Sequence, residues 1–351
     1  MRRRSERGAG TLEYVGVTLV GAILILGVLI VTNTGSVGNA FSRAICSVVE
    51  RSGCSVNAGS GESPYDQATS GEYVALGDSY SSGEGAWDYE EGTDFDDRND
   101  LWPFNDDEED HNRCHRSENA YSQVIAGDNE FAGGSSFVAC SGATTEDLDN
   151  ENDQNTGEDP QLDALSDETS LITMTMGGND LGFADVVKDC IINGEGGVSF
   201  VDTCQEKHED RIQDELPTLM DELVDYYERL KAEAPNSRII IIGYPPLFDP
   251  NVGDSLGNLL FEEDMLWMNE KAEQLNAMLA EAAEEAGVEF IDPSDAFAGH
   301  GIGSDDPWLN DLDIGGPGFS VADPSSFHPN AAGHAAIAEL VQQQLENPRY
   351  R

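Results

Sequence analysis

Five short apolar runs separated by helical patterns constrain the fold of this chain more than any other feature of its 351 residues. Each run has the length and apolar character of a buried strand, and the run RIIIIGY is typical of a central one. Strands that alternate with helices form a parallel sheet covered on both faces, so the sequence predicts an α/β domain. The predicted strands are Tyr73–Leu76, Ser136–Ala139, Leu171–Met176, Arg238–Ile242 and Val288–Ile291.

Four helical patterns lie among these runs. The longest is amphipathic, with a stripe that includes Leu219, Leu223 and Leu230. Such a stripe faces a core and leaves the opposite side of the helix to solvent. The predicted helices are Ala120–Ala126, Glu209–Ala234, Glu262–Ala286 and Ala331–Leu345.

The N-terminal region reads as a membrane segment. Arginines in RRRSER (2–7) precede the apolar run Val15–Val31, which as a helix would be about 26 Å long, enough to cross a bilayer core when Thr32 extends it. Arginines before the span place the N-terminus in the cytoplasm. We therefore predict a single-pass protein of the cell membrane that contacts the membrane through residues 15–32 and carries its main domain outside. A secretory signal peptide is the alternative.

Three regions follow from this layout. Residues 1–34 form a basic cytoplasmic tip and a transmembrane helix. Residues 35–71 form an extracellular stalk, whose end, 57–71, is rich in Gly, Ser and small polar residues and is typical of a linker. Residues 72–351 form the α/β domain.

The formal net charge of −50, from 68 acidic and 18 basic residues, excludes nucleic acid as a partner because such a surface repels polyanions. The acids are spread over helices and loops, which favours a salt-adapted surface over a specific acidic binding face. The segment Trp87–Asn112 is densest in carboxylates. It is either a solvated acidic insertion or a calcium loop, although it lacks the full EF-hand spacing. We predict no metal and no cofactor.

The six cysteines contain no CxxC pair, so a structural zinc site is not expected. An even number in an exported chain indicates disulfides, with buried free thiols as the alternative. Their order along the chain suggests the pairs Cys46–Cys54, Cys114–Cys140 and Cys190–Cys204.

Three candidate site residues follow predicted strands. Ser79 lies in ALGDSYSSGEG (75–85), where a serine at a strand tip is held rigidly and the following turn can direct N–H groups at an oxyanion. Gly142 lies in CSGATTEDL (140–148), and its N–H could face the same cleft. Asn179 lies in TMGGNDLGF (175–183) and offers a side-chain amide. Each residue alone is also an ordinary turn former.

His328 lies in SFHPNAAGH (326–334), just before the proline that opens the last predicted helix. Histidine is the side chain best suited to take a proton from serine near neutral pH. Taken singly, a His-Pro pair is more often structural. The carboxyl ends of parallel strands meet at one edge of a sheet, which favours a shared site for all four residues.

Together these motifs resemble the SGNH hydrolases, or GDSL esterases and lipases, over roughly residues 72–346. The resemblance implies a three-layer α/β/α sandwich with a five-stranded, flavodoxin-like parallel sheet. It also implies Ser79 as nucleophile, His328 as base, and an oxyanion hole of Ser79, Gly142 and Asn179. The stretches RCHRSENAY and FVACSGAT resemble the disulfide-containing actinobacterial branch.

One position departs from the family pattern. An aspartate usually stands three residues before the histidine, but here that residue is Ser325. Four interpretations stay open: the Ser325 carbonyl orients His328 in a Ser-His dyad, Asp323 replaces the aspartate, a carboxylate remote in sequence does so, or the site is degraded. The histidine needs some acceptor to fix its tautomer.

The string RGAGTLEYVGV resembles the start of Flp-type pilins. In that family a prepilin peptidase cuts after a glycine, here Gly8, and the fifth mature residue is a glutamate, here Glu13. The resemblance covers about 25 residues and implies a prepilin peptidase and pilin-like subunits as partners. The protein would then be processed and released, or pilus-associated.

The function predicted from these features is that of a carboxylic ester hydrolase that acts on lipids, short acyl esters or acetylated glycans through a serine acyl-enzyme. A polysaccharide O-deacetylase is the alternative within the same class. A non-catalytic, glycan-binding pilus or surface subunit is the alternative outside it.

Overall fold

A five-stranded parallel sheet lies at the centre of the described part of the chain, with the order β2-β1-β3-β4-β5. This computed structural model describes residues 63–95, 111–152, 154–194, 204–251, 260–313 and 323–348, all within one unit, Glu62–Arg351. The strands are β1 Glu72–Gly77, β2 Ser135–Phe137, β3 Thr169–Thr175, β4 Arg238–Ile242 and β5 Glu289–Ile291. This order is that of flavodoxin-like sheets, so the predicted sheet and its topology are confirmed.

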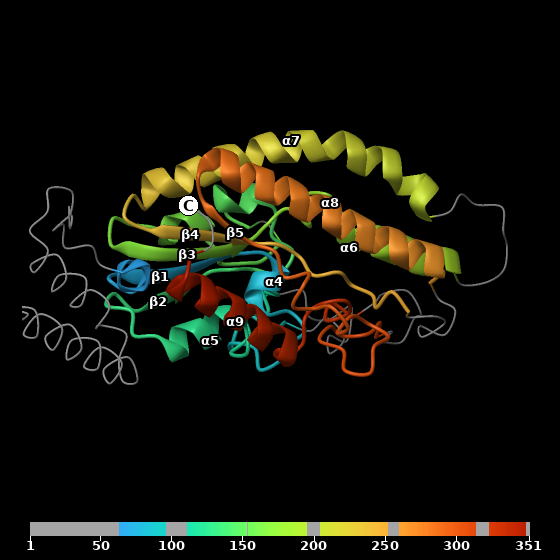
Figure 1. Cartoon of the computed structure of the whole chain (residues 1–351), viewed down its shortest axis with the longest axis horizontal. Coiled ribbons are helices and arrows are strands. Elements are labelled where there is room, and N and C mark those ends of the chain that lie inside the picture. The colour runs from blue at the N-terminus through green and yellow to red at the C-terminus, as the bar shows by residue number, and fades with distance from the viewer. Residues whose placement is uncertain are drawn as a thin grey trace, which may run out of the picture. The chain divides into compact units, whose positions relative to one another are not determined.

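Helices cover both faces of this sheet (Figure 1). On one face lie α7, Cys204–Glu233, and α8, Glu262–Ala286. On the other lie α5, Tyr121–Asp128, and α9, Ala331–Glu346. The result is the expected three-layer α/β/α sandwich.

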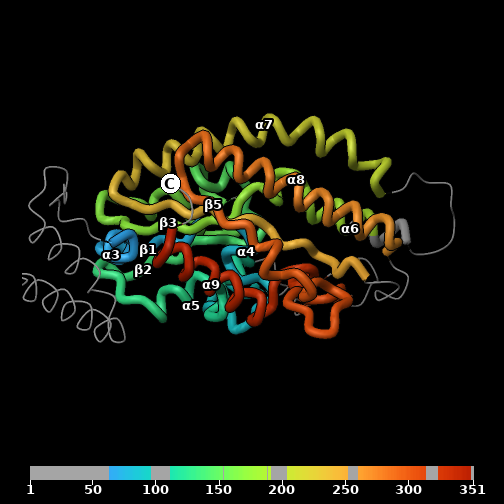
Figure 2. The backbone as a smooth tube through the Cα atoms, in the orientation of Figure 1, coloured from blue at the N-terminus to red at the C-terminus, as the bar shows by residue number. Residues whose placement is uncertain are grey.

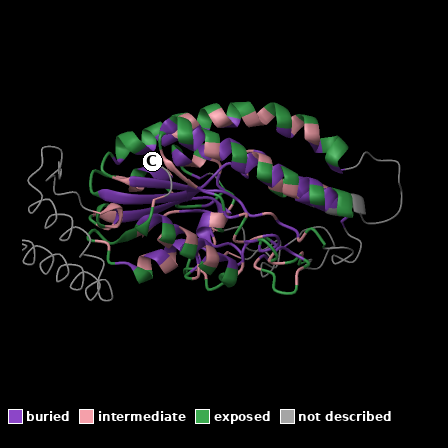
Figure 3. Ribbon diagram, viewed as in Figure 1, coloured by how far each residue is buried: buried purple, intermediate pink, exposed green. Residues whose placement is uncertain are grey.

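Strand alternation explains why each face has its own core. In β1, Val74 and Leu76 belong to the core cluster that contains the α7 and α8 leucines, whereas Tyr73 and Ala75 belong to the cluster under α5 and α9. Successive side chains of a strand point to opposite faces, so a strand covered on both sides is apolar throughout. The central strands β1, β3 and β4 are accordingly buried and the outer helix surfaces exposed (Figure 3).

The carboxyl ends of the strands meet at one edge, where the site is built. The short helix α4, Ser79–Ser82, follows β1 there. The long segment between β5 and α9 lies beside α4, although it is far from it in sequence (Figure 2). Its Asn310 donates from Nδ2 to the carbonyl of Gly85, at 2.9 Å. The remaining elements are the 3-10 helices η3 Thr145–Leu148 and η4 Gln161–Ala164, and α6 Phe183–Gly194.

The helices α3 and α6 are among the elements that were not predicted. The first, α3 (Pro64–Ala68), lies within the segment 57–71 that resembles a linker, and Ser63 caps it through a reciprocal bond with Asp66. A capping box at Ser63 and a buried Ala68 stabilise this single turn despite the polar composition. The second is α6, whose apolar residues Phe183, Val186, Val187 and Cys190 recur at helical spacing although no helix was predicted there.

Several predictions concern residues that the structure does not describe. They include the membrane segment 15–32, the pair Cys46–Cys54 and most of the acidic insertion 87–112. Within the ranges that are described, no helix combines the length and the apolar character needed to cross a bilayer.

Candidate active site

Ser79 lies where β1 passes into α4. Asp78 caps α4 by accepting from the N–H of Tyr80, at 3.0 Å, and Ser79 is the first helical residue. Gly77 precedes them with φ of +124°, and a Cβ there would lie 2.5 Å from the carbonyl oxygen of Thr175 on β3. Only glycine fits this turn, which fixes the direction in which the serine leaves the strand.

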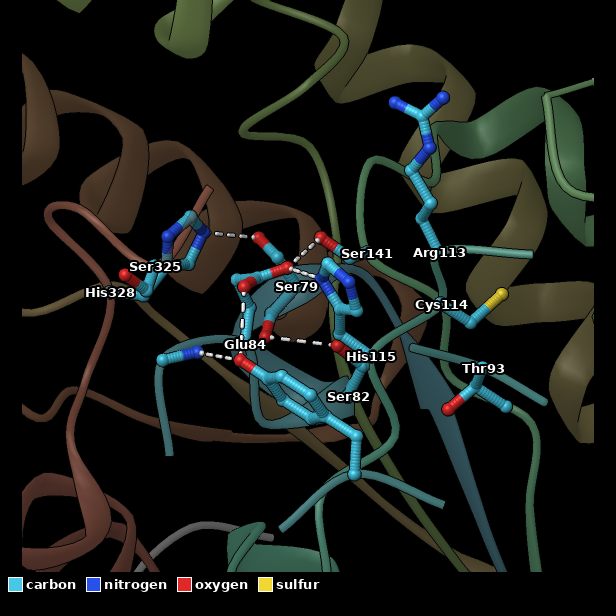
Figure 4. Close-up of polar contacts among 12 residues, drawn as sticks. Ser79, Ser82, Glu84, Thr93, Arg113, Cys114, His115, Ser141, Ser325 and His328 are labelled. Atoms are coloured by element: carbon cyan, nitrogen blue, oxygen red, sulfur yellow. Dashed lines mark hydrogen bonds and ion pairs between the residues drawn. The ribbon is translucent and has the colours of Figure 1, made fainter. Parts of the chain in front are cut away.

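The hydroxyl of Ser79 contacts His328, as Figure 4 shows. The distance between Ser79 Oγ and His328 Nε2 is 2.7 Å. The two residues are 249 positions apart in sequence. The structure thus brings together the predicted nucleophile and base at hydrogen-bond distance, the geometry that proton transfer requires.

The acceptor behind His328 differs from the prediction. The Nδ1 atom lies 3.0 Å from the carbonyl oxygen of Ser326, not of Ser325. Because a carbonyl can only accept, Nδ1 carries the proton and Nε2 is left to accept from Ser79. The Oδ1 atom of Asp323 instead accepts from the N–H and hydroxyl of Ser325, at 3.0 and 2.6 Å. The Ser325 carbonyl accepts from the backbone N–H of His328, at 3.3 Å, and the role of Asp323 toward the histidine stays a prediction.

Backbone strain accompanies this arrangement. Phe327 has φ of +66°, a left-handed value that is costly for a large side chain. Its carbonyl accepts from the hydroxyl of Tyr80, at 2.8 Å, and the Tyr80 ring lies 5.1 Å from that of His328. The helix that begins with the nucleophile thus also holds the loop that carries the base.

Three hydrogen-bond donors lie near the hydroxyl of Ser79. The N–H groups of Ser79 and Gly142 have no acceptor among the residues that the structure describes. Asn179 donates from Nδ2 to the carbonyl of Ala143, at 2.8 Å, which ties its amide to the turn that contains Gly142. All three predicted oxyanion residues line one pocket with His328.

This pocket has a volume of about 380 Å³. Its polar lining includes Ser79, Gly142, Asn179 and His328. Its apolar lining comes from α6, from the loop after β4, from α8 and from the turn before His328. The larger aliphatic and phenylalanine side chains of the apolar lining are Phe183, Val187, Leu247, Leu275 and Phe327. Such a cleft can hold the acyl part of an ester next to the serine.

Burial changes the acid-base behaviour of the site. Desolvation lowers the pKa of His328, against the opposing effect of Glu84, which favours the charged ring. Desolvation raises the pKa of Asp78 to about 6, against hydrogen bonds from Thr175 and Tyr244. Tyr244 also accepts from the N–H of Gly178, at 3.1 Å, so this hydroxyl links the nucleophile turn to the turn before Asn179.

Sequence reasoning missed Tyr244, Glu84 and the whole apolar lining. Tyr244 ends the run RIIIIGY and Glu84 ends the motif GDSYSSGE, so both were visible. No local pattern marks them, because their partners come from distant segments.

Two predicted disulfides lie in the described residues, and both are present. Cys114 is bonded to Cys140, and Cys190 to Cys204. The first attaches the segment at Cys114 to the turn that contains Gly142. The second joins the end of α6 to the start of α7.

A doubly wound α/β fold with a serine, a histidine and amide donors at the strand ends defines a serine hydrolase. Comparison with known proteins shows which family of serine hydrolases this is. Residues 75–336 match the GDSL-like Lipase/Acylhydrolase family, and the chain belongs to that family. It is therefore a serine ester hydrolase of the esterase and lipase type.

Individual relatives agree with this assignment. A lipase of Streptomyces rimosus is 31% identical over 272 residues, which cover 78% of this chain and 85% of that lipase. Lipase 1 of Streptomyces coelicolor is 32% identical over 75% of this chain and 82% of its own length. The structure of phospholipase A1 from Streptomyces albidoflavus NA297 has a TM-score of 0.62, with 32% identity over 78% of this chain and 99% of that one.

The predicted localisation, a single-pass protein of the cell membrane, is wrong. The Streptomyces rimosus relative in the solved structures is an extracellular lipase, with a TM-score of 0.61, 28% identity and coverage of 78% of this chain and 99% of that one. The segment on which the prediction rested precedes both the family match and the described residues.

Proposed function

We propose that this protein is an extracellular enzyme that hydrolyses acyl esters of lipids, with Ser79 and His328 acting as a dyad. The observation that carries the proposal is the 2.7 Å contact between Ser79 Oγ and His328 Nε2 beside an apolar pocket of about 380 Å³. The names of the relatives, lipase and phospholipase A1, support a lipid substrate.

The first half-reaction forms an acyl-enzyme. Ser79 Oγ attacks the ester carbonyl while its proton moves to Nε2 of His328. The oxyanion accepts from the N–H groups of Ser79 and Gly142 and from Nδ2 of Asn179. When the tetrahedral species collapses, the alcohol leaves with the proton from Nε2. The Ser326 carbonyl holds the ring in the tautomer that both transfers need.

The second half-reaction returns the enzyme to its starting state. Water gives a proton to Nε2 of His328 and its oxygen attacks the acyl carbon. The carboxylic acid leaves, and Ser79 Oγ regains the proton. No other group has to gain or lose a proton, so a dyad with a neutral acceptor behind the histidine is sufficient.

The test is turnover of p-nitrophenyl esters by the wild type and by Ser79→Ala. We expect the variant to lose about 10⁴-fold or more in kcat while keeping the circular dichroism and melting temperature of the wild type. Equal rates for the two proteins would sink the proposed function. A rate that drops steeply beyond acetate would instead support the deacetylase alternative.

A further inference from the structure

A buried carboxylate that the reaction does not consume lies next to the nucleophile. Glu84 is only 1% exposed, and its N–H donates to the carbonyl of Ser79 itself, at 3.1 Å. Burying a carboxylate is expensive unless several groups satisfy it. The cluster around Glu84 therefore needs an explanation beyond packing.

Three side chains satisfy this carboxylate, and Figure 4 labels two of them, His115 and Ser141. Oε2 accepts from the hydroxyl of Ser141, at 2.9 Å, and contacts Nδ1 of His115. Oε1 accepts from the hydroxyl of Tyr89, at 3.2 Å. Burial raises the pKa of Glu84, but the hydrogen bonds with His115 and Ser141 and the electrostatic effects of His115 and His328 outweigh it and lower the pKa, so the carboxylate is charged at neutral pH.

The contacts with His115 and Ser141 connect Glu84 to the oxyanion turn. Both residues directly follow a cysteine of the Cys114–Cys140 disulfide. Ser141 also directly precedes Gly142, and its N–H donates to the carbonyl of Cys114, at 3.0 Å. Glu84 thus contacts both ends of the disulfide loop through its carboxylate and the nucleophile turn through its backbone N–H.

The same turn lies against the histidine. A Cβ added to Gly85 would lie 3.1 Å from Cβ of His328 and 2.5 Å from Nδ2 of Asn310. That amide donates to the carbonyls of Gly85 and Ser325, at 2.9 and 3.2 Å. The backbone next to Glu84 is therefore packed directly on the loop that carries the base.

We propose that Glu84 is a positioning residue that holds the Gly142 turn beside Ser79 and supplies, from a distance, the negative charge that a dyad lacks behind its histidine. The proposal rests on the proposed function. It also accounts for the serine at position 325, where the family usually has an aspartate. The negative charge that stabilises the imidazolium of His328 then comes from the nucleophile turn and not from the residues just before the histidine.

The charges that face His328 have opposite effects. Glu84, from the turn after α4, favours the charged ring, and His115, from the disulfide loop, disfavours it. His334 on α9 interacts with it electrostatically, and Tyr80 on α4 contacts its ring. Asp323 lies in the same pocket, with Oδ1 bonded to the Ser325 N–H and hydroxyl. Among these groups, Glu84 and His115 provide a pair of variants with predicted shifts of opposite sign.

The experiment compares the pH profiles of kcat/KM for the wild type, Glu84→Gln and His115→Gln, using p-nitrophenyl octanoate. Glutamine keeps the size of Glu84 and can still accept from Ser141, but it removes the charge. We expect the acid limb to move to lower pH by about one unit in Glu84→Gln and kcat to fall about tenfold. In His115→Gln we expect the limb to move to higher pH.

A merely structural role would lower kcat in both variants and leave both acid limbs at the wild-type position, and that result overturns the proposal. If circular dichroism shows that Glu84→Gln does not fold, His115→Gln decides alone: an upward shift supports the proposal and an unmoved or downward-shifted limb overturns it. Ser79→Ala is measured in parallel. If it is inactive while the limbs coincide, only the role of Glu84 fails; if it is as active as the wild type, the proposed function itself fails.

Discussion

The polar and the apolar lining of the pocket are built from sequence in different ways. The polar lining comes from short motifs at the ends of β1 and β3, after β2 and before α9, where the backbone fixes each residue. The apolar lining comes from single residues on α6, α8 and two loops. The first therefore identifies the reaction from sequence alone, whereas the second, which we propose selects the acyl group, becomes visible only in three dimensions.

The largest expected effect is a loss of kcat when a residue of the polar lining is substituted. Asn179→Ala removes a donor to the oxyanion, and we expect kcat to fall about 10²–10³-fold, because such a donor acts mainly in the transition state. The loss should be the same for acetyl and octanoyl esters. Steady-state kinetics on both esters measures it, with the unfolding free energy as the control. A loss that depends strongly on chain length would show that Asn179 belongs with the substrate-selecting residues.

Each lining is also tied to its own disulfide, and this gives the second comparison. The cysteine pair Cys114–Cys140 is separated by 26 residues and Cys190–Cys204 by 14. Loop-closure entropy predicts that replacing either pair by serines lowers the unfolding free energy by about 3 kcal/mol, slightly more for the longer loop. Chemical denaturation measures this loss.

The kinetic consequences of the two replacements should differ. Loss of Cys114–Cys140 frees the turn of Gly142, so kcat should fall for every ester. Loss of Cys190–Cys204 loosens α6, which carries Phe183 and Val187, so the preference for long acyl chains should weaken. The same kinetic pattern in both double variants would contradict the separation of the two linings.

The sequence predicts this fold well because apolar runs of strand length and amphipathic helices are local signals. All five strands were located within a few residues, and Ser79, Gly142, Asn179 and His328 were assigned to one site. What failed has a common cause. The Ser326 carbonyl orients His328 through a strained turn at Phe327, and Glu84 acts through partners dozens of residues away. Neither a backbone conformation nor a long-range contact leaves a pattern in neighbouring residues.

A substitution in the apolar lining should change selectivity without changing the chemistry. Val187→Trp fills part of the pocket, and each methylene that can no longer be buried costs about 0.8 kcal/mol, or roughly fourfold in kcat/KM. We expect the ratio of octanoate to acetate turnover to fall at least about tenfold, with acetate turnover nearly unchanged. Chain-length profiles of wild type and variant measure the ratio. A profile that keeps its shape would place the acyl chain elsewhere.

The smallest expected effect is in the pH response, which should not depend on the apolar lining. Burial lowers the pKa of His328 from the ordinary value of 6.5. A base must be neutral to accept the proton of Ser79, and a lowered pKa keeps it neutral to lower pH. The acid limb of kcat/KM should therefore have its midpoint below pH 6.5, measured from roughly pH 4 to 9. Val187→Trp should keep this midpoint, because its side chain carries no charge. A wild-type midpoint above 6.5 would mean that nearby carboxylates outweigh desolvation at His328. A midpoint that is displaced in Val187→Trp would mean that the two linings are not independent.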